Sequence, residues 1–349
     1  MIINNKGIKN FGQPYIIAEI GANHNGDMDL AMSIIDSAVE CGVDAVKFQS
    51  WTDKSLIAQS EYDSNQTYND SGKKHFGSLR QMVEAYYLRD EQHHLLKEYC
   101  DKKGIVFCST PFSNEEADLL YDIGVPFFKV ASMDINHIRL LKDIAQKGKP
   151  VILSTGMATL SEIETAVRTI ETQGNKDIII LHCVSVYPPD SKDIHLHNIT
   201  SLQKIFPDYP IGFSDHTIGV SIPIAAVALG AAVIEKHFTI DKNLPGWDHE
   251  ISADPDEMKF IVEQSQIVNA ALGRFERTIS AAEQHKKTKF RRSIVLTRDM
   301  RKGEVISKSD ITFKRPGTHI RPDEEKYVIG RRINRNMCND ELLDWDDLI

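Results

Sequence analysis

The chain has 349 residues, of which 41% are hydrophobic and 26% are charged, and its formal net charge at pH 7 is −9. This composition is that of an ordinary globular protein, and the length suffices for one large domain with a small one, or for two of middling size. The acidic balance argues against nucleic-acid binding, although an acidic surface can still enclose a basic pocket.

The cysteines and the first residues favour the cytoplasm. Scattered thiols without CxxC spacing are typical of a reducing compartment, and most of them lie in apolar runs that we expect in the core. The five cysteines are Cys41, Cys100, Cys108, Cys183 and Cys338. The N-terminus lacks the basic start and long apolar stretch of a signal peptide. No run approaches the roughly 18 uncharged apolar residues that a membrane span requires.

Short β-rich apolar runs alternate with amphipathic stretches from Tyr15 to about Gly273. The runs are nearly continuous in apolar residues, as expected for strands buried on both faces. The predicted strands are Tyr15–Ile20, Ala45–Gln49, Ile105–Ser109, Phe127–Val130, Val151–Ser154, Ile178–His182, Ile211–Phe213 and Ala232–His237. The predicted helices are Met28–Cys41, Leu79–Lys103, Glu115–Ile123, Ile138–Lys147, Leu160–Thr172, Ile199–Ile205, Val220–Leu229 and Asp256–Leu272.

Eight strand–helix units over about 260 residues predict an α/β protein built on a (β/α)8 TIM barrel, which we assign to residues 1–273. A doubly wound open sheet is the rival, but such sheets seldom carry eight units, and no GxGxxG follows the first strand. The polar segment Trp51–Lys74 is too long for an ordinary connection, so it is either a substrate-covering loop or a disordered insertion.

The end of the chain predicts a small β-rich domain. Residues 274–290 are polar and basic and indicate a partly helical linker. Within 291–349 we predict short strands at Ser293–Leu296, Ile311–Lys314 and Tyr327–Ile329. A core of this size alone is marginal, so we expect docking on a barrel, either its own or a partner's.

Every predicted barrel strand ends in polar or ionisable residues, and active sites of such barrels lie at these carboxyl ends. Lys47 and Lys129 stand inside apolar strands, where a buried ammonium requires an anion. With Ser132, Ser154 and Thr155 nearby, these lysines could hold a phosphate or a carboxylate. Schiff-base formation by a lysine is the rival interpretation.

His216 and His237 end neighbouring strands, so that their imidazoles could bind one divalent ion, with water and substrate in the open positions. The alternative interpretation makes them helix caps and core histidines, and Ser214-Asp215 could equally cap the helix that follows. Other histidines are weaker metal candidates: we expect His93 and His94 to be solvated on a charged helix, and His195 and His197 to lie in a loop.

Eight strings in order along the chain carry a family resemblance: IIAEIGANHNGD, AVKFQS, FCSTPF, FFKVASMD, ILSTGMAT, LHCVSVYP, IGFSDHT and VIEKHF. Together they resemble the sialic acid synthase, or nonulosonic acid synthase, family, whose members include N-acetylneuraminate and legionaminate synthases. The tail ITFKRPGTHIRP, followed by Ile329-Gly330-Arg331, resembles the C-terminal SAF (antifreeze-like) domain of that family.

The resemblance implies a transferase that condenses phosphoenolpyruvate with an N-acetylmannosamine-type sugar and water, releasing phosphate and a nine-carbon 2-keto acid. It implies a divalent cation, typically Mn²⁺ with Mg²⁺ or Co²⁺ as alternatives, held by His216 and His237. Glu19 would lie beside the metal. The phosphoenolpyruvate would be held by Lys47, Thr110, Lys129, Ser132, Ser154 and Ser214.

The sugar side of the implied site comes from two subunits. Gln49, Asp134, Tyr187 and Asp248 would face the sugar, with Glu19, Lys47, Lys129 and Asp134 as the catalytic set. Arg315 would reach the sugar from the SAF domain of the other subunit in a domain-swapped homodimer.

Two departures from the family pattern bear on the sugar. Asp134 replaces a common glutamate, so this carboxylate is one methylene shorter. The string Pro245-Gly246-Trp247-Asp248-His249 keeps Pro-Gly and Asp-His, which favours the sialic or legionaminic branch over the pseudaminic branch. The indole of Trp247 could pack against the methyl and second acetamido group of a legionaminic-type precursor, or simply pack under its own loop.

The sequence leaves three alternative functions open. One is a pseudaminic acid synthase. Another is a 3-deoxy-keto-acid phosphate synthase, which would require more arginines at the strand ends than this chain offers. The non-enzyme alternative is a ligand-binding SAF module on an inert barrel, which would release no phosphate from phosphoenolpyruvate.

Overall fold

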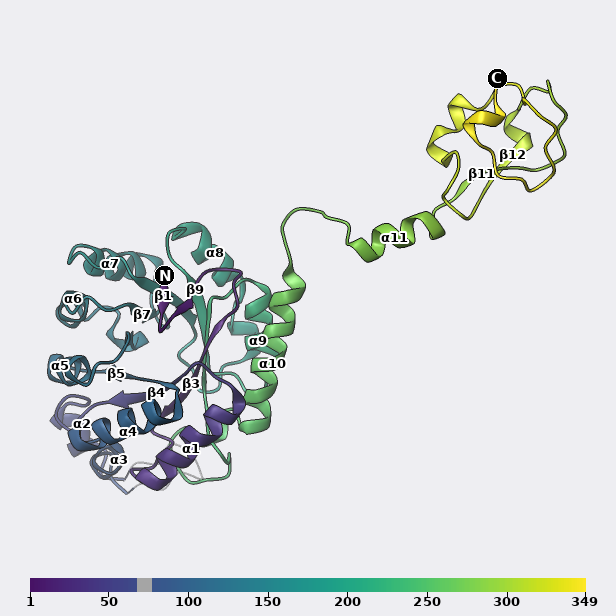
Figure 1. Ribbon diagram of the computed structural model, residues 1–349. Helices are drawn as coiled ribbons and strands as arrows, with labels where there is room; N and C mark the ends of the chain where they lie inside the picture. Colours follow the sequence, from purple (N-terminus) through teal and green to yellow (C-terminus); the bar gives the residue numbers. More distant parts are fainter. Residues whose placement is uncertain (68–76) are drawn as a thin grey trace. The chain divides into compact units, whose positions relative to one another are not determined.

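The computed structural model describes residues 1–67 and 77–349, and its residues form two compact units, Met1–Gly273 and Arg274–Ile349 (Figure 1). We call these the barrel unit and the C-terminal unit. Within residues 1–67 and 77–349, no helix combines the length and the apolar character that crossing a membrane would require.

Eight parallel strands form the centre of the barrel unit. Their order is β5-β4-β3-β10-β9-β8-β7-β6, and the strands at its two ends, β5 and β6, also contact each other. The strands are β3 (Tyr15–Gly21), β4 (Ala45–Ser50), β5 (Val106–Pro111), β6 (Phe128–Val130), β7 (Val151–Ser154), β8 (Ile178–Cys183), β9 (Ile211–Asp215) and β10 (Val233–His237). The sheet therefore curls into a near-closed (β/α)8-like barrel, and the predicted fold class is confirmed.

Helices surround the strands, as Figure 1 shows. They are α1 (Met28–Cys41), α4 (Asp90–Lys103), α5 (Asn114–Ile123), α6 (Ile138–Gln146), α7 (Leu160–Glu171), α8 (His197–Ile205), α9 (Ser221–Ala228) and α10 (Pro255–Leu272). Their ends follow local chemistry. Asp254 caps α10 by accepting from the Glu257 N–H, and Gly42 ends α1 in the left-handed conformation that glycine adopts without steric cost.

Side chains that point into the barrel change character along each strand, because alternate residues of a strand face the same side. At the amino ends they are apolar and form one cluster, which includes Ile17, Ala45, Ile152 and Ile179. Two residues further along the same strands stand Glu19, Lys47 and Ser154. The interior thus has an apolar floor below and a charged layer above.

Two features of the barrel unit were missed by the sequence analysis. Strands β1 (Ile2–Ile3) and β2 (Lys6–Gly7) form an N-terminal hairpin, and Ile3 and Ile8 pack into the apolar floor. The predicted helix Leu79–Lys103 is two helices, α3 (Leu79–Tyr86) and α4, because the chain turns extended at Tyr87 and Arg89.

The described part of the long polar segment is folded. Helix α2 (Gln59–Ser64) and α3 share an apolar cluster that includes Trp51, Tyr62 and Met82. For these residues the alternative of a disordered insertion was wrong, and the alternative of a substrate-covering loop stays a prediction. The hydrophobic periodicity of this segment did not predict the helix, because the segment contributes only a few apolar residues to the cluster. Residues 68–74 of the predicted segment lie outside the described part of the chain.

The C-terminal unit has its own apolar core, formed by residues such as Ile294, Ile306, Ile333 and Leu343. Helix α11 (Ala281–Phe290) covers most of the predicted linker, and β11 (Ser293–Leu296) pairs antiparallel with β12 (Ile311–Lys314), with the predicted bounds. The predicted strand Tyr327–Ile329 was wrong. Pro322 and three acidic residues after it instead start a 3-10 helix, Pro322–Tyr327.

Candidate active site

A cavity of about 400 Å³ opens at the carboxyl ends of the barrel strands. Twelve of the fourteen residues proposed from the sequence line it: Glu19, Lys47, Gln49, Thr110, Lys129, Ser132, Ser154, Tyr187, Ser214, His216, His237 and Asp248. These residues come from all eight strands or the loops that follow them. The convergence of so many polar side chains on one apolar-floored cavity marks it as the default site for chemistry.

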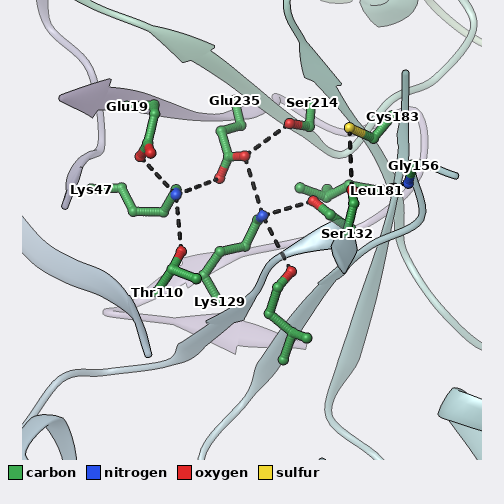
Figure 2. A network of polar contacts seen from close by, with 12 residues as sticks. Glu19, Lys47, Thr110, Lys129, Ser132, Gly156, Leu181, Cys183, Ser214 and Glu235 are labelled. Carbon is green, nitrogen blue, oxygen red and sulfur yellow. Dashed lines mark hydrogen bonds and ion pairs between the residues drawn. The ribbon is translucent and has the colours of Figure 1, made fainter. Parts of the chain in front are cut away.

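Two lysines and two glutamates form the centre of the site (Figure 2), and we call Glu19, Lys47, Lys129 and Glu235 the quartet. The Lys47 Nζ lies 2.7 Å from a Glu19 oxygen and 3.9 Å from Glu235. The Lys129 Nζ lies 3.3 Å from the other Glu235 oxygen. The anions expected beside the buried lysines are therefore two carboxylates of the protein itself, Glu19 and Glu235.

Glu235 had no assigned role in the sequence analysis, although it stands in the VIEKHF string. It touches both lysines, and its carboxylate accepts a hydrogen bond from the Ser214 hydroxyl at 2.9 Å. Strand alternation was the signal that could have found it, because Glu235 and His237 are two residues apart and face the same side.

Hydroxyl groups surround the ammonium groups. Lys47 donates to Thr110 Oγ1 at 3.0 Å (Figure 2). Lys129 donates to Ser154 Oγ at 2.7 Å. Ser132 accepts from the Gly156 N–H at 3.0 Å. Thr155 is not part of this set, because its hydroxyl donates to the Leu181 carbonyl and is buried there. The site thus offers cations and hydroxyls to an anionic ligand.

The pKa values of the two carboxyl groups in the quartet are shifted in opposite directions. Burial raises the pKa of Glu19 above its ordinary value, and the Lys47 charge offsets this only in part. Burial acts on Glu235 in the same sense, but the charges of Lys129 and Lys47 outweigh it and lower the pKa of Glu235. Burial would lower the pKa of Lys47, yet the two carboxylates raise it. Two carboxyl groups whose pKa values are moved apart by their surroundings suit acid–base chemistry.

His216 and His237 lie together at the ends of β9 and β10, with ring centroids 5.4 Å apart. The His216 Nδ1–H donates to the Val184 carbonyl at 2.8 Å, which leaves Nε2 to act as a ligand. The buried His237 Nδ1 has no hydrogen-bond partner among the described residues, and the Asp248 carboxylate lies 3.7 Å away.

These features fit a divalent cation. Burial, and then the charge of His216, lower the pKa of His237 well below its usual range, so the imidazole stays in the neutral form that binds metals. Within the described residues, His, Cys, Asp and Glu side chains form no group of three or more with metal-binding geometry. A cation held by two imidazoles would have positions for water and substrate.

The remaining wall of the cavity is aromatic and apolar on one side. Gln49 donates to Glu19 at 2.7 Å, and the Tyr187 ring lies 4.1 Å from the His216 ring, centroid to centroid. Trp247 lines the cavity and also contacts Trp51 edge to face at 6.2 Å. Trp247 thus faces the site and is packed by its neighbours at the same time.

Two proposed residues do not line this cavity. Asp134 ends a short 3-10 helix, Ser132–Asp134, whose other two residues do line it, and burial raises the pKa of Asp134 to about 6. Arg315 is an exposed residue of the C-terminal unit, with its guanidinium 4.8 Å from the Phe290 ring centroid.

Two other expectations need correction. His93 is buried and bonds to Ser50 at 2.7 Å rather than being solvated, because it lies on the same face of α4 as Leu96 and Cys100. Asp215 and its neighbour across the strands, Lys236, do not line the cavity. They pair with each other at 2.7 Å on the opposite face of the barrel wall, and Asp215 accepts from the Thr217 N–H instead of capping α9.

The remaining histidines and the cysteines can be compared with the expectations for them. His94 is exposed on its helix and His195 is exposed in a loop, as expected. His197 is exposed too, but the expectation of a loop was wrong for it, because it is the first residue of α8. Four cysteines are buried and Cys338 is exposed, but Cys183 lines the cavity rather than the core alone.

Comparisons with known proteins point to one family. The NeuB family model matches residues 34–277, and the SAF domain model matches residues 291–349. The N,N'-diacetyllegionaminic acid synthase of Legionella pneumophila is 40% identical over 96% of this chain and 94% of its own length. The N-acetylneuraminate-9-phosphate synthase of Homo sapiens is 33% identical over 94% of this chain and 91% of its own length.

A solved structure shows the same relationship. The N-acetylneuraminic acid (sialic acid) synthetase of Leptospira borgpetersenii, in complex with citrate, superposes with a TM-score of 0.74 at 37% identity, covering 82% of this chain and 94% of that one. The family resemblance read from the sequence is therefore confirmed. This chain belongs to the NeuB family and carries a C-terminal SAF domain.

Proposed function

We propose that this protein condenses phosphoenolpyruvate with an N-acetylated mannosamine-type sugar and water, to give a nonulosonic acid and inorganic phosphate. The quartet carries the proposal, because two buried ammonium groups with hydroxyls around them face a cavity that also holds a histidine pair. Relatives named for legionaminic, sialic and pseudaminic acid synthesis support the reaction class.

Phosphoenolpyruvate would occupy the quartet side of the cavity. Lys47 and Lys129 would hold its phosphate and carboxylate, with Thr110, Ser132, Ser154 and Ser214 donating hydrogen bonds. Fixed cations of this kind orient the reactant and stabilise the charge that develops on the leaving phosphate. The apolar floor beneath them keeps the electrostatic interactions strong.

A divalent cation, Mn²⁺ in our proposal with Mg²⁺ or Co²⁺ as alternatives, would be held by His216 and His237, and when bound it polarises the sugar aldehyde. The protein's own groups would move the proton. As C3 of phosphoenolpyruvate bonds to the aldehyde carbon, the aldehyde oxygen gains negative charge. Water then adds at C2, and the Glu19 carboxylate would take a proton from that water and pass it to the aldehyde oxygen. The tetrahedral intermediate collapses with cleavage of the bond between C2 and the phosphate oxygen, and the proton of the C2 hydroxyl leaves with the phosphate, giving the 2-keto acid.

The sugar would face Gln49, Tyr187, Asp134 and Asp248, with Arg315 supplied by a second copy of the chain. The charge distribution supports such a domain-swapped homodimer. Residues 274–349 contain 18 Lys and Arg against 13 Asp and Glu, a net charge of +5, whereas residues 1–273 contain 23 against 37, a net charge of −14. Opposite charges favour docking of a C-terminal unit on a barrel, as the proposed dimer requires. We place the dimer in the cytoplasm, consistent with four buried unpaired thiols.

The test is an assay of the full chain with phosphoenolpyruvate, Mn²⁺ and a panel of sugars, with phosphate release measured alongside mass spectrometry of the keto acid. We expect equal amounts of phosphate and a nine-carbon keto acid with at least one N-acetylated sugar. Phosphate without keto acid, or no turnover with any sugar and metal, would contradict the proposal. Deleting residues 291–349 should lower kcat/KM strongly, and full activity would remove Arg315 from the site.

A further inference from the structure

The string IIAEIGANHNGD supplies Glu19 to the active site, but the residues that follow in it have no task in the proposed mechanism. They form the turn between β3 and α1, and we call residues 23–26 the asparagine turn. Its two asparagines, Asn23 and Asn25, do not line the cavity. Both instead bond to the connection between β10 and α10. Part of that connection, residues 245–249, reaches the cavity, and we call it the cavity loop.

The side-chain amide of Asn25 bonds to both ends of the cavity loop. Its Nδ2–H donates to the Pro245 carbonyl at 2.7 Å, and its Oδ1 lies 3.3 Å from His249 Nε2. An amide oxygen only accepts, so the His249 Nε2–H is the donor of this second bond. His249 is 1% exposed, and its other ring nitrogen bonds to Thr239 Oγ1 at 2.7 Å. The ring is therefore held on both sides, and one amide spans the loop.

Gly246 shows how closely the loop lies on this amide. A Cβ atom at Gly246 would lie 2.6 Å from Asn25 Oδ1 and 2.3 Å from the His249 ring, so the loop backbone requires glycine at this position. Asn25 itself has a φ of 52°, in the left-handed region that asparagine adopts more readily than most other residues. The turn and the loop therefore fit together through residues that few others could replace.

Asn23 holds the far end of the same connection. Its Nδ2 donates to the Phe238 carbonyl and to Ser252 Oγ, each at 2.9 Å. The Ser252 hydroxyl in turn donates to the Asp248 carbonyl at 2.6 Å. Asn23 is fully buried, so these bonds are shielded from water. The backbone of Asp248 is thus fixed from the asparagine turn as well.

The cavity loop carries two residues that line the cavity, Trp247 and Asp248. The Asp248 carboxylate lies 3.7 Å from His237 Nδ1. A displacement of about 1 Å at a reacting centre can cost about 100-fold in rate, even when its cause lies far from the chemistry. The bonds that hold the loop therefore bear on the reaction although they lie outside the cavity.

Resting on the proposed function, we propose that Asn25 is a positioning residue for Asp248. Its amide holds the cavity loop by both ends, so that the Asp248 carboxylate stands beside His237 and faces the sugar. Asn25 touches no reactant and acts through Asp248. Both halves of the amide are needed, the donor for Pro245 and the acceptor for His249.

The first experiment measures kcat/KM for the better substrate of N-acetylmannosamine and 2,4-diacetamido-2,4,6-trideoxymannose in the full chain and in Asn25→Gly. Glycine removes the amide and tolerates the positive φ. We expect kcat/KM for the sugar to fall at least about tenfold. The Kd for phosphoenolpyruvate should change less than about twofold, because none of the printed bonds of Asn25 reaches the quartet.

A near-isosteric variant and a control in the same turn accompany it. Asn25→Asp keeps the acceptor for His249 but turns a carboxylate oxygen toward the Pro245 carbonyl, so it should lose at least as much. Asp27 accepts from the Asp29 N–H at 2.8 Å and caps α1. Asp27→Ala should lower the melting temperature by about 2 °C and leave kcat/KM within about twofold.

Two measurements separate positioning from a general loss of stability. In an Asp248→Ala background, Asn25→Gly should lower kcat/KM less than about twofold, because the group that it positions is gone. Hydrogen exchange of residues 239–252, which requires no substrate, should be about tenfold faster in Asn25→Gly and unchanged in Asp27→Ala.

The outcomes distinguish this role from the proposed function. Normal kcat/KM in Asn25→Gly, or the same fold loss with and without the Asp248 side chain, would overturn the positioning role and leave the proposed function intact. Unchanged hydrogen exchange in Asn25→Gly would overturn the hold on the loop itself. Absence of keto acid from the parent protein with either sugar would overturn the proposed function, and with it the role of Asn25 toward the sugar.

Discussion

Two buried lysine sites lie back to back in the wall of this barrel, and they differ in what their charges face. Lys236 and Asp215 are cross-strand neighbours on β10 and β9, and the pair just before them, Glu235 and Ser214, occupies the same two strands on the opposite face. Lys236 is 1% exposed and is satisfied by Asp215 at 2.7 Å and the Thr217 carbonyl at 2.6 Å. Its environment is closed.

The inner site is open by comparison. Lys47 and Lys129 are as buried as Lys236, but they line a cavity and share one carboxylate, Glu235, between them. The difference teaches how to separate a structural ion pair from a functional one. A closed pair that is hydrogen-bonded within the protein holds two strands together, whereas charges of similar burial that border a cavity can exchange partners with a ligand.

The largest expected effect is the loss of turnover on changing His237, the residue that follows Lys236 on β10. His237→Ala removes a proposed metal ligand from the cavity face, so turnover should fall by on the order of 10³ while the folded state persists. Metal affinity, measured by titration with Mn²⁺, should fall in parallel. Near-normal turnover in this variant and in His216→Ala would refute the metal assignment.

Lys236→Met tests the other face at the neighbouring position. The variant leaves the Asp215 carboxylate buried and unpaired, which should cost about 3–5 kcal/mol of unfolding free energy. Activity per folded molecule should stay within about tenfold. The double variant Asp215→Asn/Lys236→Met removes both charges and keeps the acceptor for the Thr217 N–H, so denaturant unfolding should show most of the stability regained. A double variant as unstable as the single one would argue against the pairing.

The smallest expected effect is a change in stability on replacing Asp134. This carboxyl group lies beside the cavity and has no lysine partner, so it differs from both lysine sites. Its pKa of about 6 in the folded protein exceeds the ordinary value of 3.8, so folding favours the protonated form. Stability from this group is complete below pH 3.8 and is lost as pH rises through 6. Asp134→Asn should therefore stabilise the protein by about 2 kcal/mol at pH 8 and by less at pH 4.5. A difference that is independent of pH would contradict this account.

The sequence predicted the barrel and most of the cavity because both depend on local patterns. Apolar runs located the strands, and strand ends located Lys47, Lys129, His216 and His237 at one rim. The partner of each charge was not predictable in the same way. Glu235 meets Lys47 across 188 positions of sequence, and only the closed arrangement of strands brings them together.

Other misses have specific causes. The burial of His93 could have been read from its spacing to Leu96 and Cys100, which place it on the apolar face of its helix. The N-terminal hairpin is too short to show periodicity. The contacts of Trp51 with Phe112 and Trp247 join three connections that converge in space, and no local sequence pattern predicts such convergence.

The central claim, that the inner lysines bind a ligand while the outer lysine serves structure, is tested most directly by titrating phosphoenolpyruvate into the full chain with Mn²⁺ present and no sugar. Lys129→Met should raise the Kd for phosphoenolpyruvate at least about 100-fold, because a charge-assisted contact to the anion is lost. Lys236→Met, measured under conditions where it is folded, should change the Kd less than about threefold. Equal changes in the two variants, or an unchanged Kd in Lys129→Met, would contradict the account.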